Sequence, residues 1–402
     1  MKTILFVLAA FALQTTAASV AQAGGSPTCV APEVKLSWPA VDPVWEMCWL
    51  GPDDSVSPRG SGMELRNVYR NGELVMRRAH APMLFAEYKG GQGGDCYRDW
   101  KDDTSSVLAA AVVQNQLGTI PGGGEPAITA CDRSQNPTLS YGTCPYGLTV
   151  APGYNCTEGL AIEDMGTYVR LTTQYRADWY MYSSRFEFHR DGRMVPSFGF
   201  GNRNGTFNSV THWHTNYWRF EFDIDGQGNN VVSINGIDQA AEFSDLRDAT
   251  GGPGGGQTTW EVRNPTTGNG YRFVPSASDY AVATNESGRN FHTTDFMATQ
   301  AHGGEYGDNP NYNLFDCTMD QNALVNGESI ANNNQAIYYR VSVRDATANS
   351  WPNGCSGGGC IPQDSMVCKN AGPSLVPIGP WAEFIFYDGF DVLVPGAVFS
   401  AL

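Results

Sequence analysis

Two histidines separated by one residue are the first candidates for chemistry in this sequence. They lie in Thr211-His212-Trp213-His214, where aromatic and β-branched neighbours predict a β-strand. Because successive side chains of a strand point to opposite faces, both imidazoles share one face and can chelate a single metal ion. The alternative is a polar sheet face that binds no metal.

A row of carboxylates follows in Phe220-Glu221-Phe222-Asp223-Ile224-Asp225-Gly226. Alternation assigns Glu221, Asp223 and Asp225 to one face, and clustered carboxylates favour a hard cation such as calcium. We expect the calcium ligands to be the carboxylates of Glu221 and Asp223 and the backbone carbonyl of Phe222 between them. The alternative is a solvated strand face that ends in an Asp-Gly turn.

The order of several motifs resembles that of the copper amine oxidases, specifically their large catalytic β-sandwich domain. The segment 211–226 looks like the family's copper strand, with its acidic calcium strand downstream. Tyr180-Met181-Tyr182 resembles the strand Asn-Tyr-(Asp/Glu)-Tyr, whose first tyrosine is converted to the topaquinone cofactor. Phe85-Ala86-Glu87-Tyr88 and Tyr97-Arg98-Asp99 are similar to the segment that carries a cofactor-contacting tyrosine and the catalytic aspartate.

The resemblance implies oxidation of primary amines to aldehydes, with release of ammonia and hydrogen peroxide. Tyr180 would become the quinone, and Asp99 would remove the proton from the carbon beside the amine nitrogen. Tyr88, Tyr97 and Tyr182 would surround the cofactor, with Tyr88 hydrogen-bonded to a quinone oxygen and Tyr97 gating access. The implied partners are a primary amine, dioxygen and a second copy of the chain in a homodimer.

The copper ligands implied by the resemblance are His212, His214 and Asp345. In the family a third histidine occupies the position that Asp345 has here. A carboxylate also binds copper, although two imidazoles and one carboxylate make a harder site than three imidazoles. His302 is the substitute candidate for the third ligand, and His292 is a less favoured one.

Two residues beside the expected cofactor also depart from the family pattern. Trp179 stands where the family has Asn, and Met181 stands where it has an acidic residue. These departures favour a competing interpretation, in which the chain is a catalytically degenerate exported relative that acts as a metal-binding or structural protein. A third interpretation leaves Tyr180 unmodified, as a metal ligand or radical.

The elements that must position these residues are predicted to be antiparallel strands. Period-2 alternation marks segments 63–69, 182–188, 218–224 and 338–343, and Asn71-Gly72 and Asp191-Gly192 are signals for type I′ hairpin turns. Residues 24–60 are rich in Pro, Ser and Gly and predict an extended lead-in. One large, all-β antiparallel sandwich over residues 61–402 is the expected architecture.

Composition narrows the function classes. The chain has 402 residues, 41% of them hydrophobic, and a net charge of −16, which argues against nucleic acid or an anionic membrane as partner. Residues 1–23 have the charge, apolar run and Ala-Gln-Ala end of a cleaved signal peptide, so we expect a secreted or periplasmic protein. The 10 cysteines are then expected in disulfides.

Overall fold

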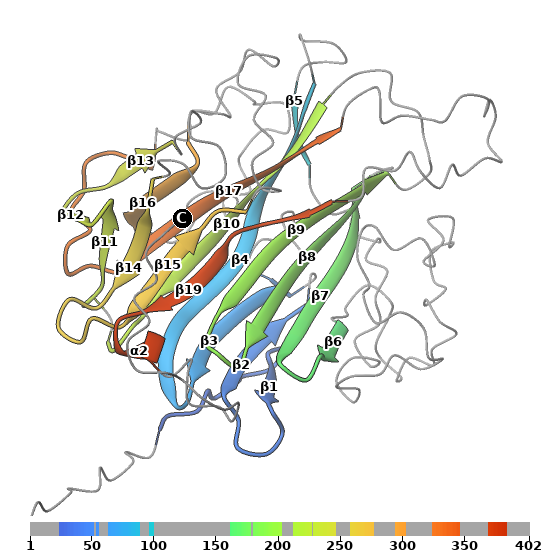
Figure 1. Cartoon of the computed structure of the whole chain (residues 1–402). Helices are drawn as coiled ribbons and strands as arrows, with labels where there is room; N and C mark the ends of the chain where they lie inside the picture. Colours follow the sequence, from blue (N-terminus) through green and yellow to red (C-terminus); the bar gives the residue numbers. More distant parts are fainter. Residues whose placement is uncertain are drawn as a thin grey trace, which may run out of the picture.

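The computed structural model describes residues 24–51, 54–55, 63–88, 96–99, 161–177, 180–202, 212–226, 228–246, 258–276, 294–302, 324–345 and 369–383. In this part of the chain the structure consists of two large antiparallel β-sheets and one short helix, α2 (Pro380–Glu383). The expected all-β antiparallel sandwich is confirmed (Figure 1). The residues proposed as a signal peptide, 1–23, lie outside the described part.

The first sheet has nine strands and contains the histidine pair. Its order is β1-β2-β3-β4-β10-β17-β16-β13. Strand β5 pairs with β4, on the edge of β4 opposite to β10. The long central strands arise from extended runs of alternating apolar residues. Their bounds are β1 (Val34–Trp38), β2 (Trp45–Leu50), β3 (Glu64–Arg70), β4 (Glu73–Tyr88), β5 (Cys96–Asp99), β10 (His212–Phe222), β13 (Phe243–Asp245), β16 (Phe296–Gln300) and β17 (Gln335–Asp345).

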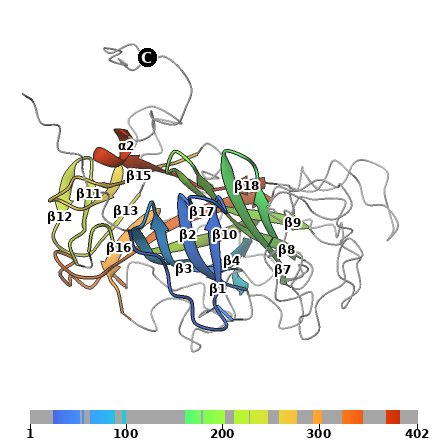
Figure 2. The same cartoon turned by 90° about the horizontal axis from the view of Figure 1, so that it is seen from below.

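The second sheet has ten strands and contains the expected cofactor strand. Its order is β12-β11-β14-β15-β19-β9-β8-β7-β6, and β18 pairs with β9. In Figure 2 strands β7 to β9 lie to one side and β11 and β12 to the other, with β1 to β4 between them. The bounds are β6 (Ala161–Asp164), β7 (Tyr168–Ala177), β8 (Tyr180–His189), β9 (Met194–Asn202), β11 (Val231–Ile234), β12 (Ile237–Gln239), β14 (Trp260–Arg263), β15 (Gly270–Val274), β18 (Lys369–Ala371) and β19 (Ser374–Ile378).

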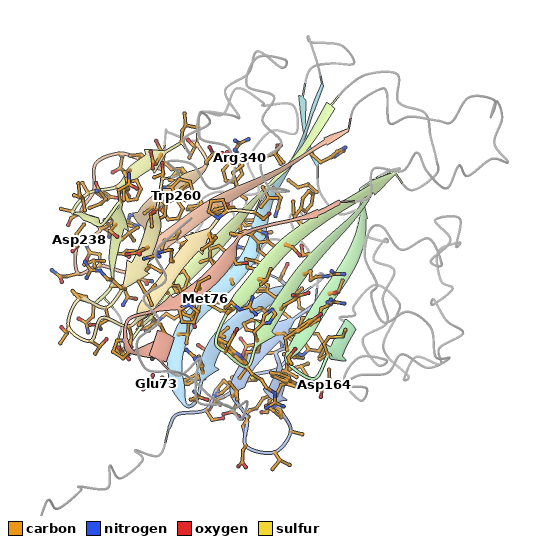
Figure 3. All side chains as sticks on the ribbon, viewed as in Figure 1. Glu73, Met76, Asp164, Asp238, Trp260 and Arg340 are labelled. Carbon is orange, nitrogen blue, oxygen red and sulfur yellow. A yellow bond between two sulfur atoms is a disulfide. The ribbon has the colours of Figure 1, made fainter. Side chains whose placement is uncertain are left out.

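An aromatic core joins the two sheets. Trp218 of β10 contacts Phe186 of β8 with ring centroids 5.0 Å apart, and Phe296 of β16 contacts Phe273 of β15 at 5.1 Å. Trp260 stacks on Phe296 at 4.8 Å and is labelled in Figure 3 among the side chains of this core. Burial of such large apolar side chains is the main force that holds the sheets face to face.

The N-terminal segment differs from the prediction of an extended lead-in. Within residues 24–60, β1 and β2 form a hairpin that pairs through β2 with β3 and so extends the first sheet. Trp38 and Trp45 are fully buried, and a disulfide links Cys29 to Cys48. The sandwich therefore begins well before residue 61, and Cys29–Cys48 confirms one of the expected disulfides.

The two predicted hairpin turns have different geometries. Asn71 and Gly72 both have positive φ, 49° and 80°, as a type I′ turn between β3 and β4 requires. Between β8 and β9 only Gly192 has positive φ, 90°, and its N–H donates to the His189 carbonyl at 2.9 Å. This longer loop is a type I turn followed by a left-handed glycine, so the type I′ prediction for Asp191-Gly192 is wrong.

Among the described residues, no helix is long and apolar enough to cross a membrane.

Candidate metal and cofactor site

The histidine pair begins β10, a central strand of the first sheet. The register partners of His212 are Tyr88 on β4 and Asp345 on β17, so these three residues form one row across adjacent strands. His214 occupies the next row position on the same face, paired with Ala86 and Val343. Neighbouring strands are about 4.8 Å apart and alternate residues about 6.6 Å, so the backbone brings two histidines and Asp345 to adjacent positions.

This face of β10 is directed toward the second sheet. Trp218, two alternations beyond His214, packs on Phe186 of β8, which fixes the even-numbered positions as the inner ones. His214 is fully buried. The positions of His212 and Asp345 are inner by the same alternation, since the β10–β17 register runs unbroken between His212 and Phe220.

Strand β5 adds the two other residues expected from the resemblance to the same end of the sheet. It pairs with β4 so that Tyr97 lies opposite Ala86 and Asp99 lies opposite Leu84. Ala86 is also the partner of His214, so the backbone positions of Tyr97 and His214 share one row. Segment 85–88 is thus next to the histidine strand, and segment 97–99 is one strand further away, on the other edge of β4.

Tyr180 and Tyr182 lie on the second sheet, at the start of β8. Their positions alternate with Phe186 and Phe188, both buried in the core, so they are assigned to the inner face. In Figure 1 the start of β8 and the ends of β4 and β17 lie at the same end of the sandwich, toward the upper right. The fold therefore brings the expected cofactor strand and the expected metal strands to one end, on facing sheets.

The donor set at this end fits a divalent transition metal. Imidazole nitrogens suit copper, and a carboxylate widens the range of ions the site accepts.

His302 lies elsewhere, and the prediction that it substitutes for Asp345 is wrong. It follows β16, whose last residue Gln300 pairs with Gln335 at the opposite end of β17 from Asp345. Ten residues of strand separate the two ends, about 33 Å. His302 is instead 43% exposed and its Nε2 lies 2.8 Å from Oε2 of Glu328, an interaction that lowers the pKa of Glu328. His292 lies outside the described residues.

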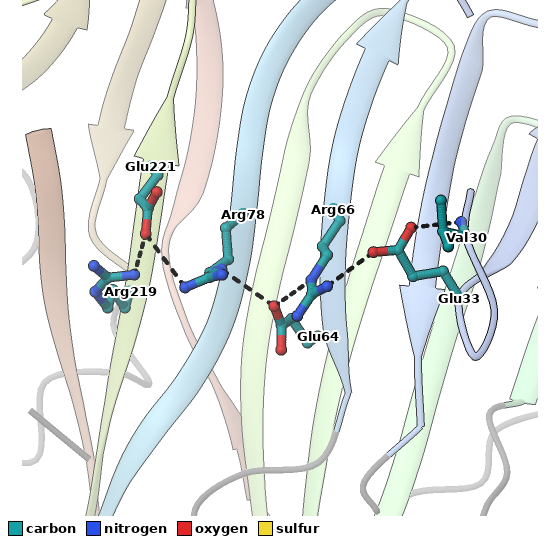
Figure 4. Close-up of polar contacts among 7 residues, drawn as sticks. All are labelled: Val30, Glu33, Glu64, Arg66, Arg78, Arg219 and Glu221. Atoms are coloured by element: carbon teal, nitrogen blue, oxygen red, sulfur yellow. Dashed lines mark hydrogen bonds and ion pairs between the residues drawn. The ribbon is translucent and has the colours of Figure 1, made fainter. Parts of the chain in front are cut away.

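The carboxylates after the histidines have arginine partners. Arg219 donates to Oε1 of Glu221, and Arg78 Nη1 lies 3.7 Å from the same oxygen (Figure 4). The Nε of Arg77 donates to Oδ2 of Asp223 at 2.5 Å. These ion pairs give the two carboxylates a structural role on the outer face, and calcium binding there stays a prediction.

The other members of the acidic run do not continue this face. Phe222 ends β10 and packs into the aromatic core, 6.1 Å from Phe273 between ring centroids. Asp225 follows the strand in a turn with φ 56°, and its Oδ2 accepts a hydrogen bond from Nδ2 of Asn269 at 3.2 Å. The expectation that Asp225 shares a strand face with Glu221 is therefore wrong, because the chain turns first.

Another group of donor atoms meets in the N-terminal hairpin. Ligand atoms of Cys29, Glu33 and Cys48 lie within 4.8 Å of one another. The two sulfurs form a disulfide, which removes the thiolates that a metal would need. Glu33 is engaged by Arg66 at 2.8 Å, so the group is structural.

Comparison with known proteins supports the fold. No family model matches the sequence, and no curated protein matches it in sequence. The structure is similar to a copper-containing benzylamine oxidase from Hansenula polymorpha, with a TM-score of 0.53 and 13% identity over 85% of this chain and 59% of that one. The chain shares a fold with copper amine oxidases. It spans less than two thirds of that enzyme's length.

A second solved structure extends the similarity. The amine oxidase of Aspergillus nidulans matches with a TM-score of 0.49 and 14% identity, over 83% of this chain and 50% of that one. At these identities the likeness identifies the fold alone.

One polar residue on the inner face of β10 went unnoticed in the sequence. Asn216 is fully buried and lies two residues after His214. Alternation in Thr211-His-Trp-His-Thr-Asn216 already assigns it to the histidine face, which is the signal that could have identified it.

Proposed function

We propose that this protein oxidises primary amines to aldehydes, with release of ammonia and hydrogen peroxide, using copper and a quinone derived from Tyr180. The observation that carries the proposal is the β10 register, which pairs His212 with both Tyr88 and Asp345. This register brings three segments far apart in the chain to neighbouring strands, in a sandwich that shares its fold with copper amine oxidases.

In this proposal His212, His214 and Asp345 hold the copper ion. When bound, copper with dioxygen supplies the oxidation of the Tyr180 ring, and the quinone accepts the two electrons that leave the amine. The overall reaction balances as one amine, one dioxygen and one water giving one aldehyde, one ammonia and one hydrogen peroxide. The carboxylate of Asp345 lowers the preference of the site for copper over other divalent ions.

The proton chemistry belongs to Asp99. A carboxylate positioned beside the substrate carbon would remove its proton as a general base. With the quinone formed, Tyr88 would donate a hydrogen bond to one of its oxygens and Tyr182 would line the cofactor. Tyr97 lines the approach of the amine.

The test is whether metal and air alone create the quinone. Metal-free protein is loaded with copper in air, and its visible spectrum and redox-cycling stain are recorded for wild type and Tyr180→Phe. The wild type is expected to develop a visible band and to stain, and Tyr180→Phe is expected to do neither. Tyr168→Phe is the matched control, because Tyr168 pairs with His189 at the far end of β8.

The second candidate function is an exported metal-binding or structural protein without catalysis. It is favoured by the departures Trp179 and Met181 in the sequence and by the carboxylate of Asp345, which pairs with His212 where the family has an imidazole. The same experiment separates the two, because this candidate binds copper and stays colourless and stain-negative.

A further inference from the structure

Asn216 lies on the inner face of β10, close to the end that begins with His212. It is fully buried, and neither its Nδ2 nor its Oδ1 has a hydrogen-bond partner among the residues that the structure describes. Its register partners are Leu84 and Val341, both members of the core between the sheets. Residues directly opposite one another share a face, so the Asn216 amide belongs to the space between the sheets.

Two further unpartnered polar groups occur around the same point. Trp218, the next inner residue of β10, is fully buried, and its Nε1 also has no partner in the described part of the chain. On the facing sheet, Ser184 of β8 is fully buried with an unpartnered Oγ, and it pairs with the core residue Phe198.

The ring contact between the sheets relates these groups to one another. Phe186 contacts Trp218 at 5.0 Å, and Ser184 and Asn216 are the next inner positions on their strands toward the end that holds Tyr180 and His212. The three polar groups therefore mark the boundary where the aromatic core gives way to the candidate site.

Unsatisfied groups at neighbouring inner positions would be costly in a dry core, because each buried donor or acceptor without a partner keeps its full cost of desolvation. Together they offer an amide donor and acceptor, a hydroxyl and an indole donor, the mixed set that an internal water molecule with two to four partners needs. An anion or a cation would find only part of this set complementary.

We propose that Asn216, Ser184 and Trp218 enclose a buried water site between the sheets, and that Asn216 is its principal anchor. The proposal does not depend on amine oxidation. If the proposed function holds, the water lies at the inner boundary of a site whose reaction consumes one water per turnover, and Asn216 is a positioning residue for it.

The test counts long-lived internal waters in metal-free protein by oxygen-17 magnetic relaxation dispersion. Asn216→Leu keeps the approximate volume and removes both polar groups. The matched control is Thr299→Val, because Thr299 is also fully buried with an unpartnered Oγ1 but lies on β16, away from β8. If Asn216→Leu does not fold, Ser184→Ala takes its place with the same expected result.

The expected result is a loss of at least one long-lived water in Asn216→Leu and no loss in Thr299→Val. The melting temperature of Asn216→Leu is expected to fall by about 2 °C or more, because the remaining groups lose their bridging partner. An unchanged water count, or an Asn216→Leu protein that is more stable than wild type, would show that the space is dry and overturn the proposal. Neither result bears on whether Tyr180 becomes a quinone.

Discussion

Asp345 is the residue that distinguishes the proposed copper site from one built of three imidazoles. Its Cα is the register partner of His212, at the end of an antiparallel ladder that continues to Phe220. Sheet pairing on this scale fixes the position of a ligand more firmly than a loop does. The proposed metal affinity therefore depends on a carboxylate whose placement is set by the backbone.

Copper titration of Asp345 variants tests this directly. Removing one ligand of three by Asp345→Ala is expected to weaken copper binding at least about tenfold, while Asp345→His is expected to bind copper more tightly than wild type. His302→Ala is the control, since His302 is paired with Glu328 on the surface and should leave affinity unchanged. Wild-type affinity in Asp345→Ala would remove this residue from the site.

Asp99 carries the proposed proton transfer, so its loss should fall on the chemical step. Asp99→Asn keeps the size of the side chain and removes the base, and turnover is expected to fall by about 10²–10⁴-fold. Single-turnover kinetics should show that the amine still binds and that reduction of the cofactor is what slows. Undiminished turnover would contradict the assignment, and Asp95 would be the next candidate.

At the scale of the element, a chain of alternating charges crosses the outer face of the first sheet. Glu64 of β3 is fully buried and its Oε1 accepts from Arg66 Nε at 2.6 Å and lies 3.2 Å from Arg78 Nε (Figure 4). Arg78 leads on to Glu221, and Arg66 leads on to Glu33 of the N-terminal segment. The ion pairs therefore connect Glu33, just before β1, with strands β3, β4 and β10.

Removing the central carboxylate should destabilise the protein markedly. In Glu64→Gln the two arginines lose their shared partner while they remain partly buried, which is expected to cost about 3 kcal/mol in the free energy of unfolding. Chemical denaturation of Glu64→Gln measures this. Glu328→Gln is the control, because the solvent-exposed Glu328–His302 pair should contribute little to stability. Equal stability of the two variants would show that the chain of charges is not cooperative.

Local sequence patterns predicted many of the elements. The alternation in 182–188, 218–224 and 338–343 falls largely within β8, β10 and β17, and Asn71-Gly72 forms the expected turn. Composition failed for residues 24–60, because their pairing with β3 is a contact between distant segments that proline and glycine content does not report. A similar signal in Asn235-Gly236 went unused, although both residues have positive φ.

The sequence could predict candidate residues for the site. It could not predict how the strands bring them together. Alternation alone assigns His212 and His214 to one face, but the pairing of His212 with Asp345 joins strands more than one hundred residues apart in sequence. The same long-range register excluded His302, which sequence proximity to β16 could not do. Side-chain partners such as Arg77 for Asp223 likewise depend on strand neighbours.

At the scale of the whole molecule, the two sheets are held together by their apolar core. Its core consists of aromatic contacts between the sheets, such as Phe186 with Trp218 and Phe273 with Phe296. The proposed copper residues lie at one end, beyond Asn216. We therefore expect chelator-treated protein to remain folded.

Copper should then act as a ligand that stabilises the folded state. At a free copper concentration one hundred times the dissociation constant, the expected gain is about 2.7 kcal/mol, seen as a raised melting temperature. His212→Ala should lose this gain and keep the melting temperature of metal-free wild type. Unfolding on treatment with a chelator would mean that the metal is structural instead.

The central claim is that Tyr180 is converted to a quinone by copper bound at His212, His214 and Asp345. Peptide mass mapping of protein loaded with copper in air, against an anaerobic copper-loaded control, tests it most directly. The account predicts a mass increase from added oxygen on the peptide that contains Tyr180, in the aerobic wild type only, and none in His212→Ala. An unmodified Tyr180 peptide in aerated, copper-bound wild type would contradict the claim.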